Sequence, residues 1–268
     1  MRLALKIAYD GRAYHGYARQ PHIKTIEGEI INALKKAGAI ENVKDAQLHV
    51  ASRTDKGVSA WGNVIAFNTS MKKDSLINAL SHIFDNIWII AYASVPKNFH
   101  PRYAKQRKYR YYLINDGLDI KKMRKAAKLF IGEHDFSNFA KIENKNPVRK
   151  IDNIIIYDGP IIKMDFIAKT FLWHQVRRIV SAIEKVGRGM SIEEIESALA
   201  GKKKTSFGIA PPENLVLVDV SYPKSLNFHY LNHVKNILKV KKNNAEKEVM
   251  MLNDMEKFLF EKTCKRNK

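Results

Sequence analysis

The order in which strand-like and helix-like patterns follow one another constrains this chain most. Over residues 1–95, alternating apolar residues predict strands and an apolar period near 3.6 residues predicts helices. Thr25 is placed to cap the first helix, whose apolar stripe holds Ile26, Ile30 and Leu34 and which ends at Gly38. The predicted order is strand, helix, strand, strand, helix, strand, over residues 3–9, 26–37, 47–53, 62–67, 75–84 and 87–95.

The second half repeats this order with unrelated residues. Asp119 caps a predicted helix that ends at Gly132, and a second helix runs from His174 to Arg188. Ser191 and Glu194 have the spacing of a capping box at the start of another helix. Strands are predicted over 107–114, 151–157, 161–167 and 215–222, the middle two forming a hairpin.

Two βαββαβ units predict an α+β protein. We expect two ferredoxin-like subdomains that share a mixed, mainly antiparallel sheet with helices on one face. The N-terminal ferredoxin-like domain is assigned to residues 1–104 and the C-terminal one to 105–223. Residues 224–268 hold 11 basic and 5 acidic residues and few turn signals, which predicts a basic helical tail.

The net charge indicates the kind of partner. Lys and Arg number 47 against 27 acidic residues, which gives +20 at pH 7. Such an excess favours a polyanion, because each phosphate contact releases condensed counterions. A basic proteome or a generic solubility surface is the alternative explanation.

Composition also bears on the compartment. The longest uncharged apolar stretch, residues 87–95, is too short to cross a bilayer, so no membrane association is expected. Cys264 is the only cysteine, and a single cysteine can form no internal disulfide. Both observations favour a cytoplasmic location.

The segment SRTDKGV, residues 52–58, holds the candidate catalytic residue. Arg53 and Lys56 flank Asp55, and an adjacent cation would keep the carboxylate ionised and oriented. Gly57 favours a tight, exposed turn. The alternative is an Asx-turn in which Asp55 bonds its own backbone and Arg53 is solvated. These seven residues alone do not exclude it.

Several segments together resemble the tRNA pseudouridine synthase A family. RTDKGV (53–58) resembles its signature loop, and four further segments occur in the family's order over residues 3–223. The sequence departs from the usual pattern at Ser52, Ser59, Tyr17 and Ala18. The further segments are YDGRAYHGYARQP (9–21), FHPR with RKYRYY (99–102 and 107–112), FLWHQVRRIVSAIEKVGRG (171–189) and APPENLVLVDVSYP (210–223).

The resemblance implies an enzyme that converts uridine of tRNA into pseudouridine, around positions 38–40 of the anticodon stem-loop, as a homodimer. Asp55 would be the catalytic carboxylate. The isomerisation moves the uracil bond at ribose C1′ from N1 to C5 without a change of oxidation state, so neither a metal nor another cofactor is expected. Asp55 could add to C1′ or C6 or remove the C2′ proton, and the sequence does not decide among these.

Three further residues are candidates for substrate binding. By resemblance, Tyr109 contacts the target base, and Arg177 is the active-site arginine that can pair with Asp55 or a phosphate. Tyr109 could instead be an ordinary strand aromatic, and Arg177 a solvated helix-surface residue. Arg53 is included because it lies beside Asp55.

Two other functions remain open from the sequence. The first is a non-catalytic RNA-binding protein, because ferredoxin-like sheets with exposed tyrosines suit single-stranded RNA. The second is an Asp-dependent metallonuclease, which the lack of a D-x-D or similar cluster disfavours. His229 and His233 have the i, i+4 spacing of zinc ligands, but no third ligand lies nearby in the sequence.

Overall fold

The computed structural model describes residues 1–80, 83–143, 146–202 and 204–264, without the side chains of residue 233 and of residues 258–264. The chain divides into a unit Met1–His229 and a unit Tyr230–Lys268. The first half of the larger unit has the predicted order of elements. These are β1 (Arg2–Tyr9), the 3-10 helix η1 (Gly11–Ala13), α1 (Ile26–Lys36), β2 (His49–Val50), β3 (Ser59–Asn68), α2 (Lys73–Leu80) and β4 (Ile87–Ser94).

The predicted start and end of α1 are confirmed. The Thr25 side chain accepts a hydrogen bond from the Gly28 N–H at 3.3 Å, which satisfies a free donor of the first turn. Gly38 follows the helix with φ of +68°, a conformation that glycine adopts without strain. Buried Ile30 and Leu34 pack with Leu5 and Ile65 of the sheet. The apolar stripe therefore fixes α1 against β1 and β3.

Two details of the first half differ from expectation. The strand predicted over residues 47–53 is only β2, because Gln47 has φ of +44° and the Ser52 carbonyl accepts from the Asn63 side chain instead of from a backbone N–H of β3. The helix predicted to reach Phe84 is described as far as Leu80; residues 81–82 lie outside the described part, and residues 83–84 are not helical.

The second half also keeps the predicted order, with one added strand, β6. Asp119 caps α3 by accepting from the Lys122 N–H at 3.0 Å. Ile192, not Ser191, is the N-cap of α5, so the capping box was wrong there. The elements are β5 (Gln106–Ile114), α3 (Ile120–Lys128), β6 (Gly132–Asp135), η2 (Ser137–Phe139), β7 (Val148–Tyr157), β8 (Ile161–Ala168), α4 (Gln175–Gly187), α5 (Glu193–Leu199), η3 (Pro212–Asn214) and β9 (Leu215–Ser221).

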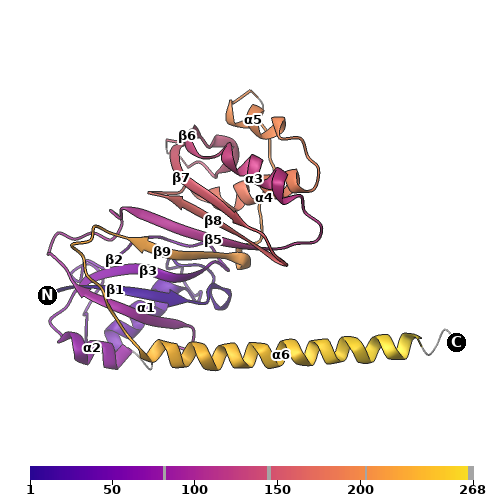
Figure 1. Cartoon of the computed structure of the whole chain (residues 1–268). Coiled ribbons are helices and arrows are strands. Elements are labelled where there is room, and N and C mark those ends of the chain that lie inside the picture. Colours follow the sequence, from indigo (N-terminus) through magenta and orange to yellow (C-terminus); the bar gives the residue numbers. More distant parts are fainter. Residues whose placement is uncertain (81–82, 144–145, 203, 265–268) are drawn as a thin grey trace. The chain divides into compact units, whose positions relative to one another are not determined.

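The strands of both halves form one sheet (Figure 1), in the order β4-β1-β3-β9-β5-β8-β7-β6, with β2 paired to β3. Strand β3 pairs with β9 in parallel, whereas the neighbouring pairs β1–β3 and β5–β9 are antiparallel. The fold is therefore α+β with a mixed, mainly antiparallel sheet, as expected. The junction β3–β9 joins the halves, and the turn that holds Asp55 directly precedes β3.

The strand β10 (His229–Tyr230) lies where the larger unit ends, and the smaller unit contains α6 (His233–Cys264). The first part of α6 is rich in lysine, and several of its apolar side chains are exposed, including Leu238, Met251 and Met255. Among the described residues, no helix has the length and apolar character that crossing a membrane requires.

Candidate active site

Asp55 is held in a tight turn in front of β3. The Val58 N–H donates to the Asp55 carbonyl at 3.2 Å, and Gly57 has φ of +83°. A turn closed between residues i and i+3 needs a positive φ at its third residue when it is of type II, and glycine meets this need without strain. The sequence DKGV therefore presents the Asp55 side chain on a fixed backbone.

Hydrogen bonds to buried polar groups fix the conformation of this turn. Asn63 on β3 is completely buried and donates to the Ser52 carbonyl at 2.8 Å. The Tyr9 hydroxyl, on β1, bonds the Thr54 hydroxyl at 2.9 Å, and the Tyr17 N–H donates to the Thr54 carbonyl at 3.0 Å. Satisfied buried hydrogen bonds of this kind specify one conformation, since leaving any of them unmade is costly. The turn is therefore preorganised.

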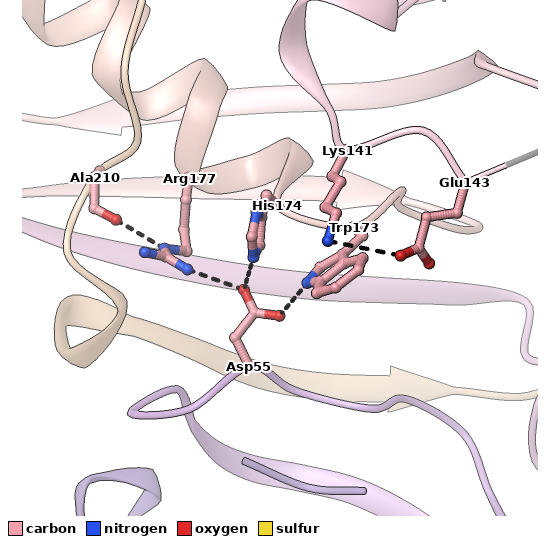
Figure 2. Close-up of polar contacts among 7 residues, drawn as sticks. All are labelled: Asp55, Lys141, Glu143, Trp173, His174, Arg177 and Ala210. Carbon is pink, nitrogen blue, oxygen red and sulfur yellow. Dashed lines mark hydrogen bonds and ion pairs between the residues drawn. The ribbon is translucent and has the colours of Figure 1, made fainter. Parts of the chain in front are cut away.

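Three side chains from the start of α4 converge on the Asp55 carboxylate (Figure 2). Trp173 donates its indole N–H to Oδ1 at 3.0 Å. Arg177 donates from Nη1 to Oδ2 at 3.0 Å, and the His174 Nε2 lies 3.5 Å from the same oxygen. These partners lie 118 to 122 residues away in the sequence and are not the backbone of the turn. The Asx-turn alternative for Asp55 is thereby set aside.

The start of α4 places these three side chains. His174 has φ of +62° and reverses the chain just before the helix. Gln175 is buried, and its side-chain carbonyl accepts from the Leu172 N–H at 2.7 Å. Burial lowers the pKa of His174, against the opposing influence of Asp55, so the imidazole is largely neutral at pH 7. Arg177 therefore supplies the positive charge next to the carboxylate.

Asp55 lies in the wall of a cleft of about 1040 Å³ that β2, β5, β9 and the start of α4 help to line. This volume is at the upper end of the range for small-molecule sites. Cationic side chains outnumber the acidic ones, and histidines add hydrogen-bonding groups. The Lys and Arg residues of the lining are Arg53, Lys56, Arg102, Arg107, Lys141, Arg149 and Arg177.

Tyr109 lines the same cleft from β5. It is nearly buried, and its ring meets Phe171 edge to face with centroids 5.3 Å apart. Burial raises the pKa of Tyr109 to about 12, so the hydroxyl stays protonated and is a hydrogen-bond donor at any physiological pH. A rigid aromatic ring beside a carboxylate can orient a flat base.

Arg107, two residues before Tyr109, is buried beneath the turn. Its guanidinium donates to the Ser52 hydroxyl at 2.9 Å and to the carbonyls of Ala51 and Arg102 at 2.8 and 2.9 Å, and also to the Lys169 carbonyl. All four acceptors are neutral, and burial lowers the pKa of Arg107. One side chain thus ties together three segments that surround Asp55.

Comparison with known proteins identifies the family. A family model described as tRNA pseudouridine synthase matches residues 126–223. Curated proteins called tRNA pseudouridine synthase A from Thermococcus sibiricus and Pyrococcus abyssi are 49% and 46% identical over 226 and 227 residues. Each match covers 83% of this chain and 85% of the relative. The chain belongs to the tRNA pseudouridine synthase A family.

A fainter likeness is to a solved structure described as an H/ACA RNP bound to a substrate RNA containing 2′-deoxyuridine. The identity is 13% and the TM-score 0.33, over 70% of this chain and 43% of that one. At this level the likeness supports no inference.

Membership in the tRNA pseudouridine synthase A family agrees with the resemblance drawn from the sequence, and the structure relates the candidate residues to one another. Asp55 and Arg177 form an ion pair, and Tyr109 lines the same cleft. Arg53 also lines the cleft, but it is exposed and does not contact Asp55 among the described residues. The cation that orients the carboxylate is therefore Arg177, which the turn sequence alone could not indicate.

Sequence reasoning missed Trp173 and Lys141. The Lys141 ammonium lies 3.7 Å from the centre of the Trp173 ring, and the Lys141 N–H donates to the Trp173 carbonyl at 2.8 Å. An exposed tryptophan directly before a helix that carries a candidate active-site arginine was the available signal. In the part of the chain that the structure describes, no three His, Cys, Asp or Glu side chains form a metal-binding group. The His233 side chain, half of the suggested zinc pair, lies outside that part.

Proposed function

We propose that Asp55 is the catalytic carboxylate in the isomerisation of tRNA uridine to pseudouridine. The observation that carries the proposal is the carboxylate itself, held on a preorganised turn in the wall of a basic cleft, with one oxygen paired to Arg177. The reaction breaks the N1–C1′ bond and makes a C5–C1′ bond, so the catalyst must hold a ribose intermediate while the base turns. A carboxylate oriented beforehand suits this task, because no reorganisation is needed at the moment of reaction.

The other candidates receive roles from their surroundings. Tyr109, which packs against Phe171 and lines the same cleft as Asp55, would contact the target uracil after it has left the RNA stack. Arg177 would keep one carboxylate oxygen oriented throughout the reaction. Arg53 is exposed at the cleft and would bind substrate RNA through its phosphates. No metal or other cofactor is required by this scheme.

The proposed substrate is the anticodon stem-loop of tRNA, with target uridines around positions 38–40. The net charge of +20 and the cationic lining of the cleft support an RNA partner. A homodimer would let two copies of the cleft hold one tRNA. A cytoplasmic location agrees with the single cysteine.

We also propose that the large unit is a pair of ferredoxin-like subdomains, 1–104 and 105–223, followed by a basic helical tail, 224–268. The strand orders are β4-β1-β3-β2 in the first half and β9-β5-β8-β7 in the second. In each half the fourth strand of the unit lies next to the first, followed by the third and the second, and this shared order supports two related subdomains. The parallel pairing of β3 with β9 supports a repeat by translation along the sheet. In such a repeat the crossover helices of both halves would cover the same face.

The test is release of tritium from tRNA labelled at uridine C5, because the isomerisation exchanges that hydrogen. We expect release by the wild-type chain and its loss when uridines 38–40 are replaced by cytidine. Activity should persist in EDTA. Tight tRNA binding without release would refute the enzyme proposal and favour a non-catalytic RNA-binding protein. Release that survives the cytidine replacement would refute only the target positions.

A further inference from the structure

We propose that Trp173 is a reversible cap on the reacting oxygen of Asp55, which the entering uridine displaces. This inference rests on the proposed catalytic role of Asp55. It assigns different tasks to the two carboxylate oxygens. Oδ2 is the oxygen held in place, and Oδ1 is the one that faces the ribose.

The Oδ2 side of the carboxylate has a fixed partner. Arg177 is 11% exposed, and its Nε donates to the Ala210 carbonyl at 2.7 Å while Nη1 donates to Oδ2. The Ala210 N–H in turn donates to the Arg177 carbonyl at 3.2 Å. The guanidinium is therefore locked by two acceptors and by its place on α4, and it cannot leave without disturbing the helix.

On the Oδ1 side, the partner is a neutral side chain that is about half exposed. Its donor is the indole of Trp173, which is 41% exposed and precedes α4. The Trp173 backbone is tied to Lys141, so its main chain is held, whereas its side chain is exposed enough to turn about its own bonds. The figure shows the two donors approaching the carboxylate from different directions (Figure 2).

The chemistry requires the cap to leave. When an oxygen bonds to carbon or takes a proton, it loses negative charge, and a hydrogen bond that it accepts becomes weaker. The indole bond therefore stabilises the unreacted carboxylate more than the transition state, and such a contact slows the reaction if it is kept. The indole ring also fills the space next to Oδ1 that a ribose would occupy.

Lys141 couples this movement to the substrate. Its ammonium lies over the indole ring at 3.7 Å and 3.6 Å from a Glu143 carboxylate oxygen, and both charged side chains are about half exposed. When the indole turns away, the ammonium loses its aromatic partner and is available to a phosphate. A nucleotide that brings both a ribose and a phosphate would offset both lost contacts.

The experiment compares Trp173→Phe with Trp61→Phe in the tritium assay. Trp61 is matched in exposure, at 42%, and lies on β3 outside the lining of the cleft. Phenylalanine keeps an aromatic ring but has no donor. We expect KM for tRNA to fall about three- to tenfold in Trp173→Phe with kcat unchanged within about twofold, as the loss of one competing hydrogen bond predicts. Trp61→Phe should match the wild type.

Two results would overturn the cap. A fall in kcat of about tenfold or more at unchanged KM would mean that Trp173 stays bound in the transition state. Unchanged kcat and KM would mean that its contact has no part in turnover. Failure of the catalytic proposal looks different, because it would appear as retained turnover in Asp55→Asn, whatever Trp173→Phe does.

A spectroscopic measurement serves if Trp173→Phe does not fold. The chain has three tryptophans, so Trp61→Phe with Trp88→Phe leaves Trp173 as the only indole. Its emission should change when tRNA binds and should stay constant with a fully double-stranded RNA that offers no target uridine. The same change with both RNAs, or with neither, would contradict displacement by the target nucleotide.

Discussion

Two aspartates of this chain face cations in very different settings. Asp165 lies on β8 directly opposite Arg110 of β5, and its side chain is fully buried. Arg110 donates to both of its oxygens, at 2.6 and 2.8 Å, and the Lys108 ammonium lies 2.7 Å from one of them. Asp55 lies on a turn, is 22% exposed and has a charged donor on one oxygen only.

The difference separates a structural carboxylate from the one that we propose as catalytic. Both oxygens of Asp165 are bonded by charged side chains on rigid strands, and no solvent reaches them. Asp55 combines a rigid turn and one fixed arginine with a second oxygen whose partner is neutral and half exposed. Charge pairing alone therefore does not mark the active site. The distinguishing property is an oxygen that a substrate can reach.

The largest expected effect is that of Asp55→Asn on turnover. The amide keeps the shape and can still accept hydrogen bonds, but it has neither the charge nor the nucleophilicity of the carboxylate. We expect kcat to fall by roughly 10⁴-fold or more, as for the loss of a group on which the chemistry depends. Thermal stability and tRNA affinity should stay close to the wild type, measured by melting and by filter binding. Retained turnover would mean that another residue carries out the chemistry.

Arg107 should give the next largest effect, because it braces the site without touching the carboxylate. In Arg107→Met the bonds to Ser52, Ala51 and Arg102 are lost. A misplacement of about 1 Å can cost about 10²-fold in rate, so we expect kcat/KM to fall by about that factor together with a lower melting temperature. Arg12→Met is the control, since that arginine is 68% exposed and pairs with the nearby Asp10.

A result in which Arg107→Lys restores full turnover would contradict this role. Lysine has the charge but lacks the planar fork that reaches several acceptors at once. Charge alone would then suffice, and the bracing of three segments would not matter.

Much of the fold could be predicted from the sequence, because local patterns specify it. The caps Thr25 and Asp119, the stripe Ile30–Leu34 and the hairpin β7–β8 depend on residues a few positions apart. The short strand β6 was missed. Its four residues, GEHD, carry neither an apolar alternation nor β-branched side chains, and pairing with β7 makes them a strand.

The site was predicted less completely, because its contacts join distant segments. Asp55 and Tyr109 lie in motifs that the resemblance could indicate. The hydrogen bond from Trp173 to Asp55 spans 118 residues and depends on the left-handed conformation of His174. No local sequence pattern predicts that conformation. Arg53 was a candidate because it lies two residues from Asp55 in the sequence, and Arg177 was a candidate only through the resemblance. In the structure, Arg177 is the arginine that contacts the Asp55 carboxylate.

Asp165→Asn should have a smaller effect than Asp55→Asn, and it should lower stability instead of turnover. Removing one partner of a buried pair leaves the other charges without compensation, but Arg110 and Lys108 are partly exposed and water can solvate them. We expect a loss of about 1–3 kcal/mol in the free energy of unfolding, measured with urea. Turnover of the folded protein should be unchanged. A loss of turnover with unchanged stability would make Asp165 part of the site.

The smallest expected effect is the pH dependence of the loss in unfolding free energy caused by Asp165→Asn. Burial of Asp165 favours its neutral form, but the bonds from Arg110 and Lys108 outweigh burial and lower its pKa below the ordinary value for an aspartate. A carboxyl whose pKa is lower in the folded state stabilises the protein above its unfolded pKa, and this contribution is lost as pH falls through the folded pKa. The difference in unfolding free energy between wild type and Asp165→Asn should thus be constant near neutrality and narrow as pH falls below about 4. Urea titrations from pH 7 downward measure it, and a difference that does not change with pH would mean that Asp165 stabilises the sheet by packing rather than by charge.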